Sequence, residues 1–144
     1  MDIKVLVPIS HGTEELEAIT IIDLLRRAGI SVKVAGENEI ITCSRGVKII
    51  PDCLIHKLED NDEFDAIVIP GGLDGTYNLM NSDKLKAIIE HNNNNKCIFA
   101  AICAAPLIFA KFKLLKPDSP VTSHPSVKSI LTEYDYKEDK VVIH

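Results

Sequence analysis

Short apolar runs alternate with helical segments along this chain, and that alternation limits the folds available to it. Residues 3–8 read as a buried strand, the next segment as a helix ended by Gly29, and residues 31–35 as a second strand. Two further runs, residues 64–70 and 97–101, also read as strands. A strand, a helix and a second strand form a βαβ unit, so the pattern predicts an α/β fold with a mostly parallel sheet covered on both faces.

Smaller elements fill the rest of the chain. Thr13 is the expected N-cap of the first helix, and the asparagine run at residues 92–95 reads as a solvated loop tip. The other expected elements are a hairpin of residues 40–43 and 47–50, a helix from Ser82 to Asn92, a helix over residues 104–112, and strands at 121–122 and 141–143.

Length and composition bound the architecture and the partners. The 144 residues are expected to form a single domain, residues 1–144, with a core that needs no disulfides. The net charge of −5 is dispersed, which argues against a nucleic-acid or membrane partner. The strand pattern begins at Ile3 and leaves no room for a signal peptide, so the four cysteines are expected as free thiols in the cytoplasm. Their spacing with the five histidines fits no metal site.

Cys103 stands where a strand is expected to turn into a helix. The preceding run, residues 97–101, is apolar, and the following residues favour a helix with Pro106 in its first turn. Such a corner lifts the thiol out of the packing and places it beside N–H groups at a helix N-terminus, which lowers a thiol's pKa. The alternative is a small core residue, the commonest fate of a free cysteine.

Glu17 falls on the face of the first helix that is expected to be buried. On a helix of 3.6 residues per turn it shares one stripe with Ile21, Leu24 and Ala28. A buried carboxyl group is costly unless it is protonated or hydrogen bonded. A protonated Glu17 would donate a hydrogen bond to a thiolate, and an ionised one would take a proton from a substrate carbon. The alternative is a first-turn glutamate that points to solvent.

The ligand site of a parallel sheet lies beyond the carboxyl ends of its strands. The residues that follow strands and so gather there are His11, Gly71, Gly72, Cys103 and His124. His124 is a candidate base or hydrogen-bond donor beside Cys103. The N–H groups of the glycine pair and of Ala104 are candidate oxyanion donors. Each has an ordinary alternative, because loop histidines are often incidental and a glycine pair often marks a turn.

Six segments, spread over nearly the whole chain, form one specific combination. They are TEELE (13–17), LLRRAG (24–29), CSR (43–45), IPGG (69–72), AAICAAP (100–106) and VTSHP (121–125). In this order they resemble the ThiJ/PfpI superfamily, and within it the branch of the parkinsonism-associated protein deglycase. The resemblance implies a flavodoxin-like three-layer sandwich, a class I glutamine amidotransferase-like domain and a homodimer.

The same resemblance implies roles for particular residues. Cys103 would be the nucleophile on a strained elbow, with Glu17 hydrogen bonded to it and His124 nearby. Gly72 and Ala104 would be oxyanion donors, and oxidation would convert Cys103 to a sulfinate stabilised by Glu17.

Two features depart from the family pattern. Peptidase-like members carry histidine directly after the cysteine, where this chain has Ala104, and this argues against protease or amidase chemistry. Family members also continue beyond a strand like residues 141–143 into another strand and a final helix, so the domain is expected to be C-terminally short.

Two functions of different classes follow from these residues. The first is a cofactor-independent enzyme that acts on reactive dicarbonyls such as methylglyoxal or glyoxal, of the glyoxalase III or deglycase type, with Cys103 as nucleophile and Glu17 as proton shuttle. The second is an oxidation-sensing stress protein or redox-regulated chaperone that acts through Cys103. The sequence does not choose between them.

The first helix also predicts the assembly. Leu16 and Ile19 fall outside its core-facing arc, so one sheet cannot bury every apolar residue of the helix. A homodimer that uses this helix would bury them, whereas a monomer would leave two scattered surface hydrophobes.

Overall fold

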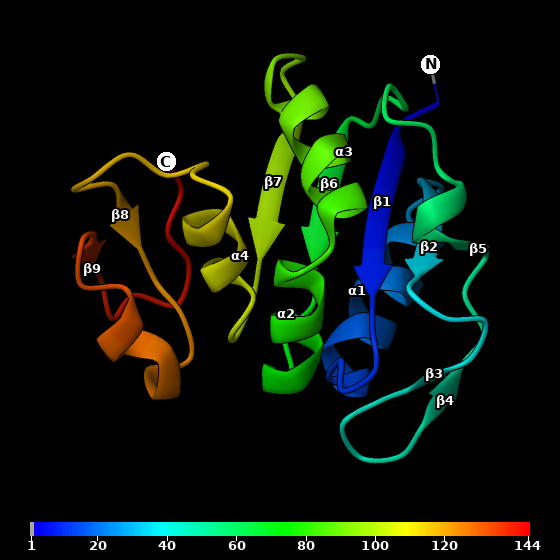
Figure 1. The fold of residues 1–144 in the computed structure, drawn as a ribbon, viewed down its shortest axis with the longest axis horizontal. Coiled ribbons are helices and arrows are strands. Elements are labelled where there is room, and N and C mark those ends of the chain that lie inside the picture. The colour runs from blue at the N-terminus through cyan, green and yellow to red at the C-terminus, as the bar shows by residue number, and fades with distance from the viewer. Residues whose placement is uncertain (1) are drawn as a thin grey trace.

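The computed structural model describes residues 2–144, and its centre is a five-stranded parallel sheet with strand order β5-β2-β1-β6-β7 (Figure 1). Its strands are β1 (Lys4–Ile9), β2 (Ser31–Gly36), β5 (Cys53–Leu54), β6 (Ala66–Ile69) and β7 (Ile98–Ala101). The carboxyl ends of β1, β6 and β7 all point to the lower edge of the view in Figure 1. The parallel α/β sheet predicted from the alternating pattern is therefore confirmed.

Strands β6 and β7, and β1 after its first residue, are apolar because the sheet is covered on both faces, whereas β2 also carries exposed polar residues. In β1, Leu6 packs into the cluster formed with α2 (Leu73–Met80), α3 (Asp83–Asn93) and α4 (Pro106–Lys111). The alternate residues Val5 and Val7 pack on the opposite face against Ala18 and Ile22 of α1 (Glu15–Arg27). Side chains that alternate between two covered faces make a continuous apolar run, as in other parallel sheets.

Helix α1 begins one residue later than the sequence pattern indicates. Its N-cap is Glu14, whose carboxylate accepts a hydrogen bond from the Leu16 N–H at 3.5 Å. The expected cap, Thr13, is fully buried, and its Oγ1 accepts a hydrogen bond from the Ser10 N–H at 3.0 Å. The prediction of Thr13 as N-cap is wrong because its hydroxyl closes the preceding loop. The helix ends as expected, before Gly29 at φ +77°.

A short antiparallel hairpin, β3 (Ile41–Thr42) and β4 (Lys48–Ile49), is attached to the start of α1. The carboxylate of Glu15 accepts hydrogen bonds at 2.8 Å from the Ser44 hydroxyl and from the Arg45 N–H. Burial raises the pKa of Glu15, but the hydrogen bonds outweigh it and the pKa lies below its ordinary value. Glu15 therefore fixes the hairpin to α1.

Three parts of the chain differ from the sequence-based prediction. Helix α2 was not expected, and the segment 141–143 is not a strand. The expected solvated tip begins with a fully buried side chain, because Asn92 accepts a hydrogen bond from the Phe64 N–H at 2.8 Å and donates to the Asp62 and Ile88 carbonyls. Asn92 thereby satisfies backbone groups at the start of the β6 segment.

The C-terminal part forms a separate small layer beside α4. It contains β8 (Pro120–Val121) and β9 (Asp135–Tyr136), which pair in parallel, and the 3-10 helix η2 (Pro125–Ile130). A second 3-10 helix, η1 (Ile55–Lys57), follows β5. Figure 1 shows the small layer to one side of the main sheet, beyond β7 and α4. Across residues 2–144, none of the helices has the length and apolar character needed to cross a membrane.

Candidate active site

Cys103 lies in the turn between β7 and α4, as the sequence predicts. Its φ is +61°, in the left-handed region that non-glycine residues rarely adopt. Such a conformation costs on the order of 1 kcal/mol or more and persists only where the surroundings impose it. Pro106 occupies the first position of α4, where its missing N–H is not needed. The strained corner therefore projects the thiol beyond the end of β7.

Gly71 holds Glu17 beside the cysteine. Its N–H donates a hydrogen bond to Glu17 Oε2 at 2.6 Å. A Cβ on Gly71 would lie 2.5 Å from Cys103 Cβ and 2.7 Å from Glu17 Oε2, closer than real Cβ contacts. Residue 71 is glycine because the thiol-bearing carbon and the carboxylate both pack against it. Its N–H is bound to Glu17, so it is not available as the oxyanion donor that the sequence suggested.

The sulfur of Cys103 meets three groups. The N–H groups of Gly72 and Ala104 favour its thiolate form, and the Glu17 carboxylate disfavours it. Burial, followed by the charge and the hydrogen bond of Glu17, raises the pKa of Cys103 above its ordinary value, and the two N–H groups only partly oppose this. The expected lowering of the pKa is therefore not found. Helix α4 has only six residues, and a carboxylate faces the thiol.

Gly72 is required for a different reason from Gly71. It adopts φ +90°, and a Cβ there would overlap the Gly12 carbonyl and the Glu14 N–H. The Gly71 carbonyl also accepts a hydrogen bond from the Glu14 N–H at 2.9 Å. These contacts interlock the loop after β6 with the loop before α1, and so bring Glu17 to Cys103.

His124 reaches Cys103 through its backbone. Its N–H donates a hydrogen bond to the Cys103 carbonyl at 2.8 Å. The imidazole is exposed, and Nδ1 accepts a hydrogen bond from the Ser126 N–H at 3.2 Å, which caps η2. The ring stands at the rim of the site, with Nε2 left for a ligand or for water.

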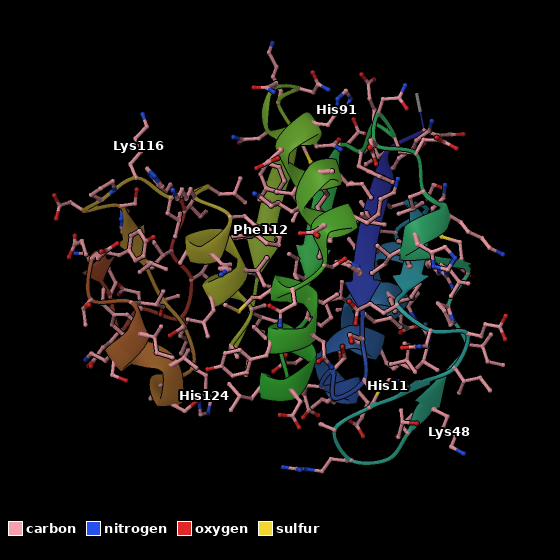
Figure 2. The ribbon with its side chains drawn as sticks, in the orientation of Figure 1. His11, Lys48, His91, Phe112, Lys116 and His124 are labelled. Atoms are coloured by element: carbon pink, nitrogen blue, oxygen red, sulfur yellow. The ribbon has the colours of Figure 1, made fainter. Side chains whose placement is uncertain are left out.

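His11 lies at the same edge of the sheet but serves a different contact. Figure 2 shows His11 and His124 both at the lower end of the molecule, apart from one another. The Nδ1 of His11 accepts a hydrogen bond from the Thr42 N–H at 3.0 Å, which ties the loop after β1 to the hairpin. His11 is not among the residues that line the pocket at Cys103.

A pocket of about 640 Å³ opens at Cys103 and has two walls. The inner wall consists of Glu17, Ala101, Ile102 and Cys103. The outer wall comes from the small C-terminal layer. Its residues are Thr122, Ser123, His124, Pro125, Lys128, Tyr136, Glu138, Asp139 and Lys140.

Sequence reasoning found the inner wall and missed most of the outer one. Lys128, Tyr136 and Glu138 follow no strand of the main sheet, so the rule that gathers residues at the carboxyl edge does not reach them. The one available signal was the density of charged and hydroxyl residues between 122 and 140. In residues 2–144 no group of three or more histidine, cysteine or acidic side chains is arranged to hold a metal ion. All four cysteines are free thiols.

Comparison with known proteins places these features in a family. Residues 3–144 match the model of the DJ-1/PfpI family. Protein dj-1beta of Drosophila melanogaster is 40% identical over 146 residues, which cover 99% of this chain and 77% of the fly protein. The crystal structure of that fly protein superposes with a TM-score of 0.92 at 39% identity, over 100% of this chain and 78% of the other.

A relative with a named activity matches as well. The glutathione-independent glyoxalase DJR-1.2 of Caenorhabditis elegans is 33% identical over 136 residues, which cover 92% of this chain and 71% of the worm protein. Its name describes a glyoxalase that does not depend on glutathione.

Proposed function

The chain belongs to the DJ-1/PfpI family, and on that premise we propose that it is a cofactor-independent enzyme that converts small 2-oxoaldehydes such as methylglyoxal to 2-hydroxy acids. One observation supports this most directly: the Cβ of Cys103, which carries the thiol, and the carboxylate of Glu17 both pack against Gly71 at the inner wall of an open pocket. A nucleophile and a proton carrier in contact are what the reaction needs.

The reaction begins with addition of sulfur to the aldehyde. The thiol proton passes to Glu17, and the thiolate adds to the aldehyde carbon to give a hemithioacetal. The N–H groups of Gly72 and Ala104 stabilise the oxyanion that forms on the aldehyde oxygen, and Glu17 then passes its proton to that oxygen, which completes the hemithioacetal and restores the carboxylate. The raised pKa of Cys103 fits this scheme, because the thiol keeps its proton until Glu17 receives it.

The second stage moves hydrogen between two carbons. Glu17 removes the proton from the former aldehyde carbon, and the resulting enediol is reprotonated on the neighbouring carbon. The aldehyde carbon is thereby oxidised and the ketone carbon reduced, which leaves a 2-hydroxy thioester on Cys103. Water hydrolyses the thioester to the hydroxy acid and restores the thiol. His124, with Nε2 at the rim, is the candidate base for that water.

The name of the worm relative supports this proposal, because that protein is called a glyoxalase that works without glutathione. The same addition to an early sugar adduct on a protein is the deglycase form of the reaction. Free thiols on all four cysteines fit a reducing compartment such as the cytoplasm.

The test is formation of lactate from methylglyoxal by the purified protein. Wild type is expected to form it, and Cys103→Ser is expected to lose turnover by about a thousandfold or more, because the covalent route is removed. Cys53→Ser is the matched control, since Cys53 lies on the far edge strand of the sheet. Equal lactate formation by Cys103→Ser would contradict the proposal.

An oxidation sensor is the second candidate function. The N–H groups of Gly72 and Ala104 would donate hydrogen bonds to the oxygens of a sulfinate, and Glu17 would do the same once its carboxyl group is protonated. Mild peroxide is then expected to add two oxygens to Cys103 while it spares Cys43, Cys53 and Cys97. Mass spectrometry of each cysteine separates this outcome from general oxidation.

We also propose a homodimer formed through α1. The side chains of Leu16 and Ile19 are 74% and 47% exposed on one side of this helix. A two-fold contact would let each residue meet its symmetry mate and bury both. Light scattering at micromolar concentration is expected to give twice the mass of the chain, and Leu16→Glu to give the mass of one chain. A dimer that survives Leu16→Glu would have to use another surface.

A further inference from the structure

The pocket at Cys103 is larger than its smallest proposed substrate requires. A volume of about 640 Å³ is in the range that holds ligands of drug size, whereas methylglyoxal has three carbon atoms. The carbonyl groups of a substrate must lie at the inner wall, where the thiol is. The outer wall is therefore left to contact whatever group the substrate carries beyond its carbonyls.

Lys128 is a cation held in a defined place on that outer wall. Its Nζ lies 5.0 Å from the centre of the Tyr136 ring and 2.7 Å from Glu138 Oε1. The hydrogen bond and charge of Glu138 raise the pKa of Lys128 above its ordinary value, so the ammonium stays charged at neutral pH. Contact with the ring face and with one carboxylate orients the positive charge.

The support beneath Lys128 is fixed by hydrogen bonds. The Tyr136 hydroxyl donates to the Ser123 carbonyl at 3.0 Å, and the Lys137 N–H donates to the Val121 carbonyl at 2.8 Å. These bonds join β9 to the segment that leads to His124, whose N–H is bound to the Cys103 carbonyl. The Tyr136 ring beneath the ammonium is therefore fixed relative to the segment that carries the nucleophile.

Glu138, in contrast, is an exposed partner. Its side chain is 80% exposed, and exposed ion pairs contribute only about 0–1 kcal/mol. A second carboxylate that entered through the pocket would meet the same ammonium from the ligand side, and Glu138 would return to water at little cost. The Glu138 carboxylate shows the kind of group that Lys128 accepts.

Resting on the proposed function, we infer that Lys128 is a subsite for the carboxylate tail of a 2-oxoaldehyde whose aldehyde carbon reaches Cys103. The other charged groups of the pocket do not supply this selectivity. Glu17 is held at the inner wall by the Gly71 N–H, and Asp139 and Lys140 are adjacent residues of opposite charge on the outer wall. Competition between Glu138 and the substrate tail for Lys128 sets the preference for charged over neutral substrates.

The test compares a charged with a neutral substrate. The pair is 4,5-dioxovalerate, which would give 2-hydroxyglutarate, and 2-oxopentanal, which has the same carbon chain without the carboxylate. The measured quantity is the ratio of their kcat/KM values. Lys128→Met is expected to lower this ratio about tenfold, the effect of one charge-assisted hydrogen bond. Glu138→Gln is expected to raise it, because the competing carboxylate is gone.

Lys137→Met is the matched control. It makes the same change of charge in the same segment, but Lys137 pairs with Asp135 at 2.7 Å and does not line the pocket. The ratio should stay at the wild-type value. An equal fall in Lys137→Met and Lys128→Met, or a fall in Glu138→Gln, would overturn the inference.

A binding experiment works without turnover and keeps the two proposals separate. Levulinate carries the carboxylate tail and a ketone but no aldehyde, and 2-pentanone lacks the carboxylate. Levulinate is expected to protect Cys103 from iodoacetamide at lower concentration than 2-pentanone, and Lys128→Met to remove that advantage. Protection of Cys103 by levulinate without turnover of any substrate would refute the proposed enzyme activity and would still support the carboxylate subsite at Lys128. Turnover of methylglyoxal without preferential protection would refute the subsite alone.

Discussion

The two walls of the pocket are built from different kinds of contact. The inner wall is fixed by backbone atoms and by glycines that no larger residue could replace, as with Gly71 between Cys103 and Glu17. The outer wall is held largely by side-chain pairs at the surface, such as Lys128 with Glu138 and His124 with Ser126. Backbone packing tolerates no adjustment, whereas surface pairs contribute little each and exchange with solvent. Under the proposed function, the inner wall carries the chemistry and the outer wall sets the substrate preference.

Gly71→Ala is expected to have the largest effect. Its Cβ would force Cys103 and Glu17 apart, and misplacement of about 1 Å at a reacting pair costs about a hundredfold in turnover. The overpacking should also lower the free energy of unfolding by about 1–3 kcal/mol. Lactate formation and urea denaturation measure the two effects.

Gly29→Ala is the control for that variant. Gly29 has φ +77° with open space around its Cβ position, so the substitution strains the backbone without touching the pocket. Stability should fall while turnover is retained. If Gly71→Ala kept full activity, the inner wall would be less rigid than the contacts indicate.

Glu17→Gln should change two properties in opposite directions. Turnover is expected to fall about a hundredfold or more, because the amide cannot carry the proton between carbons. Alkylation of Cys103 at neutral pH should become faster, because loss of the negative charge lowers the thiol's pKa. Lactate assays and the rate of iodoacetamide labelling give the two values. A parallel fall in both would show that Glu17 acts only by holding the structure.

The pH dependence of alkylation tests the electrostatics of the inner wall. With its pKa raised, Cys103 is a thiol at pH 7, and its alkylation rate should rise about tenfold per pH unit up to pH 9. Burial raises the pKa of Cys43 and of Cys97 to about 11, so these two should lag behind Cys103. Site-resolved mass spectrometry follows each cysteine. A plateau for Cys103 below pH 8 would indicate a lowered pKa.

Of the three substitutions at the site, Gly71→Ala, Glu17→Gln and His124→Ala, the last should have the smallest effect on turnover. The substitution removes the cap of η2, which is worth about 1 kcal/mol, and takes away the candidate base for thioester hydrolysis. Water can act without that base, so kcat should fall less than tenfold. A loss as large as that of Glu17→Gln would place essential chemistry on the outer wall. Single-turnover kinetics would show whether the thioester accumulates.

The sequence by itself determined the parallel sheet and the strand-to-helix turn at Cys103. Strands that consist mainly of apolar runs, separated by an amphipathic helix and a terminating glycine, specify a parallel sheet because only covered faces suit such runs. The position of Cys103 after a strand and before Pro106 follows from local preferences of the same kind. Neighbours in sequence decide such features, so periodicity alone reveals them.

Only the tertiary structure decided what surrounds the thiol. The raised pKa of Cys103 depends on its burial and on Glu17, which is distant in the chain. The contact of Gly71 with Glu17 spans 54 positions. The buried Asn92 and the Thr13 hydroxyl were both misjudged from the sequence, since their partners are set by loop packing.

The outer wall shows most clearly that contacts between distant residues cannot be predicted from local sequence. Lys128, Tyr136 and Glu138 meet because β8 and β9 pair and place η2 beside them, although none of the three carries a local signal. Local sequence specifies a helix or strand when the free energy that stabilises it comes from that element's own pattern of buried residues. A site assembled by packing between elements depends on distances that the pattern does not contain.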